Sequence, residues 1–266
     1  MVSKIYNLKT SSGLSAKVSK YWQEHIHDLK VATFDVGSFS FYKELATYRY
    51  KKLSYLKSLI DSLDLDKKEL LEVGCGVGID LMRLTQGGAN STGIDISEKS
   101  VELAKTYFEI NKFESNLLVM DAELIDFPDH SFDLVYCHST LQFTNDPKKV
   151  VDEIYRVLKP GGELVAIVYN RISWLNALSI LFNVELENCK APVFRLFSIN
   201  EFSNLLQCFD KVMVTTDRFP VKSALHKGSF NGQLYNLVAI PLLTLIPRFF
   251  TKNYGWHLIA RASKRL

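Results

Sequence analysis

The segment Glu72-Val73-Gly74-Cys75-Gly76-Val77-Gly78 places three glycines at alternate positions, directly after the apolar run Glu69-Leu70-Leu71. Helical spacing of apolar residues follows in Ile79-Asp80-Leu81-Met82-Arg83-Leu84. A strand, a glycine turn and a helix N-terminus in this order form a cradle for a small anionic or polar cofactor, since glycine lets a ligand approach the backbone. A dinucleotide-binding turn would place its third glycine at position 79, which is Ile79, so the spacing counts against that class.

Apolar segments and helical segments alternate after this turn. Their order predicts an α/β fold built on a parallel sheet. Ser97 is expected to cap one of the helices, and Pro160-Gly161-Gly162 is expected to stop another. The expected strands are 69–74, 91–95, 116–120, 132–138 and 162–169, and the expected helices are 78–86, 98–111 and 146–158.

The same segments resemble the motifs of the class I S-adenosylmethionine (SAM)-dependent methyltransferases. An acidic residue before G-x-G-x-G resembles their first motif, Ser131–His138 resembles "sFDlVy", and Ile154–Gly162 resembles "hRvLKPGG". The resemblance extends from about Leu70 to Tyr169. It implies a Rossmann-like, seven-stranded, mostly parallel sheet flanked by helices, which closes with an antiparallel pair expected at 209–216 and 255–262.

The resemblance also assigns contacts to SAM. A carboxylate about 20 residues after the turn accepts hydrogen bonds from ribose hydroxyls, and Asp95 has this place. Glu72 is expected to fix the loop or the amino group of SAM. Asp121 with Ala122 is expected to face the adenine, although a strand-end Asp also caps turns. The residues implied to contact SAM are Glu72, Gly74, Cys75, Gly76, Gly78, Asp95, Ile96, Asp121, Ala122 and His138.

No catalytic residue is fixed by the sequence, and the candidates are His138 and His27. His138 follows a strand, where it lies under the methionine tail, acts as a general base or only supports its neighbours. Gln142 and Phe143 stand where related enzymes often have an "hH" pair. This departure removes a second histidine and puts catalysis by this loop in doubt. His25 and His27 lack a third ligand, so no metal site is predicted.

The division of the chain follows from these assignments. Residues 1–64 are expected to form an N-terminal lid and helical segment, 65–170 the SAM-binding core, and 171–266 a substrate cap with the closing strands. Within the first part, residues 1–20 are expected to be a loose lead-in and 41–63 one long helix. The candidates for a lid over the cofactor are Tyr21, Trp22, His27 and Arg49, with a plain helix-entry surface as the alternative.

The C-terminal part is basic and apolar. From Arg218 to Leu266 there are eight Lys and Arg and no Asp or Glu. The run 234–250 is apolar, broken by prolines and too short to span a bilayer. It either lines a lipophilic pocket, packs as a buried cap or dips into a membrane interface, so 218–250 is the expected site of any peripheral membrane contact. Ser198 to Phe202 reads as a capping box ahead of a further helix.

These features predict a cytoplasmic SAM-dependent methyltransferase that acts on a small, lipophilic acceptor by O- or C-methylation. The four cysteines show no C-x-x-C pairing, and the first six residues show no signal-type run. No nucleic-acid module is recognisable. Two alternatives stay open: a Rossmann-type enzyme that binds a nicotinamide nucleotide, and a non-catalytic protein with a SAM fold at a membrane surface.

Overall fold

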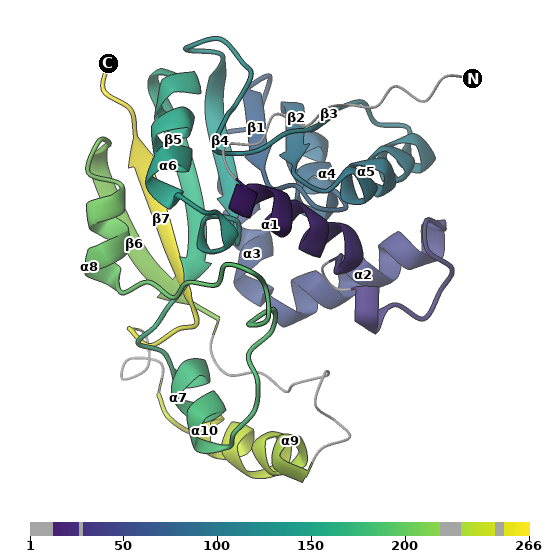
Figure 1. Ribbon diagram of the computed structural model, residues 1–266, viewed down its shortest axis with the longest axis vertical. Helices are drawn as coiled ribbons and strands as arrows, with labels where there is room; N and C mark the ends of the chain where they lie inside the picture. The colour runs from purple at the N-terminus through teal and green to yellow at the C-terminus, as the bar shows by residue number, and fades with distance from the viewer. Residues whose placement is uncertain (1–12, 27–28, 219–229, 248–252) are drawn as a thin grey trace.

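The computed structural model describes residues 13–26, 29–218, 230–247 and 253–266. Its centre is a seven-stranded sheet in the order β3-β2-β1-β4-β5-β7-β6 (Figure 1). Strand β7 runs antiparallel to both of its neighbours, β5 and β6, and the other strand pairs of the described chain are parallel. The expected seven-stranded, mostly parallel fold is therefore confirmed. The strands are β1 Glu69–Val73, β2 Asn90–Asp95, β3 Asn116–Val119, β4 Phe132–His138, β5 Leu158–Tyr169, β6 Asp210–Asp217 and β7 His257–Ser263.

Helices cover both faces of this sheet. Neighbouring strand residues point to opposite faces, so Leu71 and Val135 join one buried cluster whereas Leu70 and Leu134 join another. The described helices are α1 Gly13–Glu24, η1 Leu29–Val31, α2 Phe39–Lys52, α3 Ser54–Asp61, α4 Ile79–Gln86, α5 Glu98–Asn111, η2 Leu141–Phe143, α6 Pro147–Val157, α7 Trp174–Leu181, α8 Ile199–Leu205, α9 Phe230–Leu234, the π-helical turn η3 Tyr235–Ala239 and α10 Ile240–Thr244.

The helix caps agree with the sequence. The Ser97 hydroxyl accepts a hydrogen bond from the Ser100 amide at the start of α5. Ser198 and Glu201 form the predicted capping box of α8. These local signals act within one turn of chain, which is why they can be predicted without knowledge of the fold.

Two predictions about the N-terminal part are wrong. The expected helix 41–63 is two helices, because Leu53 leaves the helical conformation (φ −119°, ψ 64°) and buries its side chain. The expected loose lead-in is helical from Gly13 onward, while residues 1–12 lie outside the described part. Helix α1 is held by the core, since Val18 is buried and the Ser19 hydroxyl donates to the Ile96 carbonyl over 3.1 Å.

The turn at Pro160-Gly161-Gly162 also differs from the prediction. Helix α6 ends at Val157, and β5 begins at Leu158 and runs through these three residues. A register shift between Phe132 and Leu134 on β4 accommodates them. The proline and glycines therefore form an irregular strand start.

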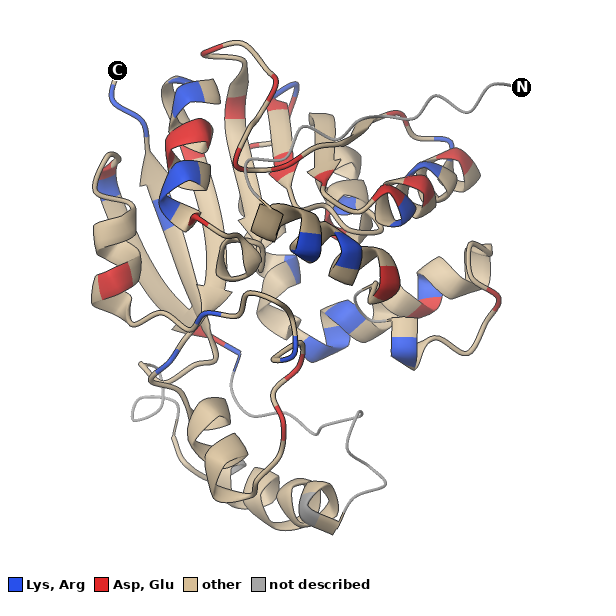
Figure 2. Cartoon of the chain, in the orientation of Figure 1, with Lys and Arg blue, Asp and Glu red and all other residues tan. Residues whose placement is uncertain are grey.

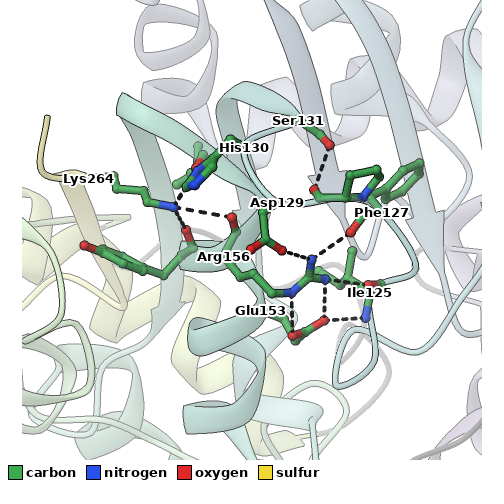
Figure 3. A network of polar contacts seen from close by, with 11 residues as sticks. Ile125, Phe127, Asp129, His130, Ser131, Glu153, Arg156 and Lys264 are labelled. Atoms are coloured by element: carbon green, nitrogen blue, oxygen red, sulfur yellow. Dashed lines mark hydrogen bonds and ion pairs between the residues drawn. The ribbon is translucent and has the colours of Figure 1, made fainter.

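Arg156, the arginine of the segment that resembles "hRvLKPGG", has a structural place in a polar network (Figure 3). Its guanidinium donates to the carbonyls of Ile125 and Phe127, each over 2.7 Å, and pairs with Glu153 and Asp129. These contacts fix the long β3–β4 connection against α6, away from the glycine loop. The pKa of Arg156 is raised mainly by its hydrogen bond to Glu153.

A separate lobe, formed by α7, α9, η3 and α10, extends beyond the sheet (Figure 1, bottom). It has a small core of its own, in which Leu178 meets Tyr235, Ala239 and Ile240. Among the described residues, no helix has the length and hydropathy needed to cross a membrane. The helices of the lobe bury the apolar side chains that face one another and leave others, such as Leu237 and Leu245, exposed.

Candidate active site

The glycine loop between β1 and α4 has a backbone that only glycine adopts freely. Gly74, Gly76 and Gly78 have φ angles of 76°, 53° and 80°. A Cβ on Gly74 would lie 2.0 Å from Oγ1 of Thr140, whereas a Cβ on Gly76 would meet no described atom within 4 Å. The loop therefore packs closely on the β4 side at Gly74 and faces open space at Gly76.

Asp95, at the end of β2, lies directly beside this loop. Its carboxylate accepts hydrogen bonds from the backbone amides of Gly76 over 2.9 Å and Ser97 over 2.8 Å. Burial raises the pKa of Asp95, although these amide hydrogen bonds oppose the effect. The carboxylate is thereby fixed next to the glycine loop, at the edge of the sheet where α/β folds bind ligands.

Glu72 presents a buried carboxyl group with unused capacity. Its exposed fraction is 2%, and its Oε2 atom has no hydrogen-bond partner among the described residues. Burial raises the pKa of Glu72 well above its usual range, and the nearby Asp80 carboxylate adds to this shift. Buried polar atoms are normally hydrogen-bonded, so Oε2 of Glu72 is suited to accept from a ligand. The ammonium group of an amino acid tail is a donor of the required kind.

Asp121 follows β3. Because β2 lies between β1 and β3, Asp121 is on the side of Asp95 opposite to the glycine loop. Its Oδ1 accepts a hydrogen bond from the Glu123 amide over 2.9 Å, so the carboxylate does cap a turn. Asp121, Ala122 and Met120 also line the same cavity as Asp95. The two readings of Asp121 offered by the sequence are compatible in this geometry.

An ion pair inside the cavity joins the N-terminal segment to the core. Asp80 of α4 is fully buried, and Nε of Arg49 on α2 donates to its Oδ1 over 2.7 Å, with a second contact from Nη2 to Oδ2. His138 adds its Nδ1 at 3.1 Å from Oδ2 of Asp80. Burial alone would raise the pKa of Asp80, but Arg49 and His138 outweigh it and hold the pKa below the usual range.

Part of the cavity lining consists of residues that the sequence analysis did not select. Lys52, Tyr169, Glu187, Arg218 and His257 come from five separate places in the chain and meet there. Burial, followed by the charge of Arg218, lowers the pKa of His257 well below its usual value, which keeps the imidazole neutral. No local motif marks these residues; the antiparallel position of β7 beside β5 brings His257 to this edge.

The residues predicted to form a lid lie in different places. Trp22 of α1 lines the cavity and lies edge-on to Phe143, with ring centroids 5.0 Å apart. Arg49 lines it through the ion pair described above. Tyr21 stacks on His25 instead, at 4.3 Å. His27, also the second catalytic candidate, lies outside the described residues.

Nine of the ten residues predicted to contact the cofactor line this one cavity. The exception is Gly78, which is not among its described lining residues. Gly78 precedes α4, and a Cβ there would lie 3.2 Å from that of Ala104 on α5, so its described surroundings are those of a helix-packing position. Gln142 is buried next to the cavity lining, and its amide atoms have no partner in the described chain.

Fold and loop together define a class I SAM-dependent methyltransferase domain. Comparison with known families agrees: residues 71–166 match the methyltransferase domain family. This chain therefore carries a methyltransferase domain of the SAM-dependent kind, for which the family implies SAM as the cofactor.

Curated relatives include the ubiquinone biosynthesis O-methyltransferase of Coxiella burnetii, which is 32% identical over 116 residues. That match covers 44% of this chain and 50% of the relative. The corresponding protein of Alkalilimnicola ehrlichii is 28% identical over 169 residues, covering 61% of this chain and 66% of the relative. The chain thus spans about half to two thirds of these relatives.

Solved structures extend the likeness beyond the matched domain. A SAM-dependent methyltransferase from Thermotoga maritima, described as a possible histamine N-methyltransferase, has a TM-score of 0.62 at 20% identity and covers 93% of this chain and 100% of its own. The [4+2]-cyclase SpnF has a TM-score of 0.60 at 18% identity, covering 95% and 97%. At such identities these structures show the fold alone, and the second shows that the fold also serves another reaction.

Proposed function

We propose that this protein transfers the methyl group of SAM to a small, lipophilic acceptor, by O- or C-methylation. The observation that carries the proposal is the buried Oε2 of Glu72, which has no hydrogen-bond partner in the described part of the chain and lies beside the open backbone at Gly76. In this proposal Glu72 holds the ammonium of the amino acid tail, Asp95 the ribose and Asp121 with Ala122 the adenine. SAM, when bound, supplies an electrophilic methyl group on its sulfur.

The contribution of the protein is to position the acceptor and to exclude water. Oriented reactants gain roughly 7–11 kcal/mol over free ones in favourable cases. Trp22, Phe143 and Tyr169 give the cavity aromatic walls, which support an apolar acceptor. Where the acceptor must lose a proton, His138 is the candidate base through Nε2, in the tautomer whose Nδ1–H donates to the Asp80 carboxylate.

The direct test is calorimetric titration with S-adenosylhomocysteine. We expect micromolar binding to the wild type and at least 30-fold weaker binding to Asp95→Ala, a loss of about 2 kcal/mol in line with a hydrogen-bonded charged group. Asp64→Ala, at an 80% exposed side chain, makes the same chemical change outside the cavity and should bind normally. Binding of NADH in place of S-adenosylhomocysteine by the folded wild type would refute the proposal and favour the nucleotide enzyme.

We further propose that the helical lobe contacts a membrane surface. Neither α7 nor the stretch 230–245 contains Lys, Arg, Asp or Glu, and the lobe carries no charge colour in Figure 2. Its exposed apolar side chains include Ile180, Leu181, Phe230, Leu237, Leu242 and Leu245. None of the described residues in 230–247 lines the cavity, which favours the interfacial alternative over a pocket wall. An exposed apolar face without charged side chains suits insertion into the interface of a lipid bilayer.

Vesicle sedimentation tests the lobe. We expect the protein to pellet with vesicles of phosphatidylglycerol and phosphatidylcholine, and Leu237→Asp/Leu245→Asp to reduce this binding at least tenfold, because each buried Leu side chain contributes about 1.5–3 kcal/mol. Met213→Asp, at a 63% exposed position on β6, is the matched control and should bind like the wild type. If Leu237→Asp/Leu245→Asp bound the vesicles as tightly as Met213→Asp does, the lobe would not be the part of the protein that contacts the membrane.

A further inference from the structure

Two cations of the cavity lining, Lys52 and Arg218, share one carboxylate. Nζ of Lys52 lies 2.7 Å from Oε2 of Glu187, and Nη2 of Arg218 lies 4.0 Å from the same oxygen. Glu187 therefore pairs closely with Lys52 and only loosely with Arg218. The neighbouring imidazole of His257 supplies no negative charge.

The guanidinium of Arg218 is buried and incompletely bonded. Its side chain is 10% exposed, and its Nε atom has no hydrogen-bond partner among the described residues. Nη1 lies 3.1 Å from Nε2 of His257, where a neutral imidazole accepts its hydrogen bond. On its other nitrogen, Nδ1, His257 contacts the Tyr55 hydroxyl. A buried cation is retained in a protein only when an opposite charge or strong acceptor compensates it.

The backbone holds Arg218 in this place. Its φ angle is 59°, which is uncommon for any residue other than glycine, and its carbonyl accepts a hydrogen bond from the Trp256 amide over 2.9 Å. Gly255 allows the close approach, since a Cβ there would lie 2.3 Å from the Asp217 carbonyl oxygen. Unusual backbone conformations that the surrounding structure enforces are concentrated at ligand sites.

We propose that Arg218 binds a carboxylate of the methyl acceptor, so that the acceptor is an apolar molecule with one anionic end. The inference rests on the proposed methyl transfer and names the substrate class of that site. A guanidinium offers paired N–H donors that match the two oxygens of a carboxylate. Tyr169 lies beside this position, stacked on His257 at 5.7 Å and on Trp256 at 4.8 Å, and it provides the apolar wall for the remainder of the molecule.

A pair of probes with the same shape and different charge tests this. We would titrate 1-naphthoate and 1-naphthamide into protein saturated with S-adenosylhomocysteine, using calorimetry. We expect 1-naphthoate to bind at least tenfold more tightly than 1-naphthamide to the wild type. Arg218→Gln should remove this preference, and Arg218→Lys should keep part of it.

The control is Arg261→Gln, which removes an equal charge from β7 at an arginine paired with Glu163 outside the cavity. It should keep the full preference for 1-naphthoate. Affinity for S-adenosylhomocysteine, measured on every variant, separates the two proposals. Two results with normal cofactor binding would overturn the carboxylate site alone. The first is that the wild type binds the two probes equally or binds neither, and the second is that the preference for 1-naphthoate survives Arg218→Gln. Loss of cofactor binding in the wild type would overturn the methyltransferase proposal.

Discussion

Arg49→Met is expected to lower the free energy of unfolding by about 3–5 kcal/mol, the usual cost of leaving a buried charge without its partner. Arg49 is the main cation beside Asp80, whose side chain is fully buried between α4 and β4. Urea denaturation at pH 7.5, followed by circular dichroism, measures the change.

The pH dependence of this loss identifies its cause. In the wild type the pKa of Asp80 is lowered, so its stabilisation is present at neutral pH and is lost only as the pH falls through that low value. Without Arg49, burial raises the pKa of Asp80, and the Asp80 carboxyl group takes up a proton instead of remaining a buried charge. The difference between wild type and Arg49→Met should therefore be smaller at pH 4.5 than at pH 7.5. A loss that is independent of pH would point to packing by the arginine stem.

Gly74→Ala is expected to cost about 3 kcal/mol of stability and to abolish binding of S-adenosylhomocysteine. A left-handed conformation costs a non-glycine residue about 1–2 kcal/mol, and the overlap of the new Cβ with Thr140 adds about 1–3 kcal/mol. Thermal unfolding and calorimetric titration of the same sample give both values.

Two further variants separate the two costs. Gly76→Ala has the same backbone problem, with a φ of 53°, but its Cβ meets open space, so it should lose only about 1–2 kcal/mol of stability. Gly74→Ala/Thr140→Ala removes Oγ1, the closest atom, and should be more stable than the sum of the single changes predicts. Strict additivity would contradict the overlap that the geometry indicates.

The core of this fold could be predicted because its signals are local. The apolar pattern of each strand from β1 to β5 lies within a few consecutive residues, as does the glycine turn. The caps at Ser97 and Ser198 likewise involve only residues within one helical turn. Nine of the ten residues predicted around the cofactor meet in one cavity for the same reason: they lie at the ends of consecutive strands, and parallel strands end at one edge.

The part of the cavity around Arg218 and His257 could not be predicted because it depends on tertiary contacts. Lys52 is aligned by the break at Leu53, where burial of one leucine in the core overrides the helical pattern of 41–63. Arg218 and His257 carry no motif, and they meet only because β6 and β7 pair across a long insertion. The helical start at Gly13 likewise depends on contacts with the loop after β2.

The position of β7 between β5 and β6 governs the order in which this protein is able to assemble. Strand β5 pairs with β7, and β6 reaches the sheet only through β7, although β6 precedes it by about forty residues. Until β7 inserts, the apolar strand Leu158–Tyr169 has an open edge that invites association with other chains. Truncation ahead of residue 257 would therefore produce an aggregating core, and the methyltransferase core cannot be isolated by cutting where its sequence motifs end.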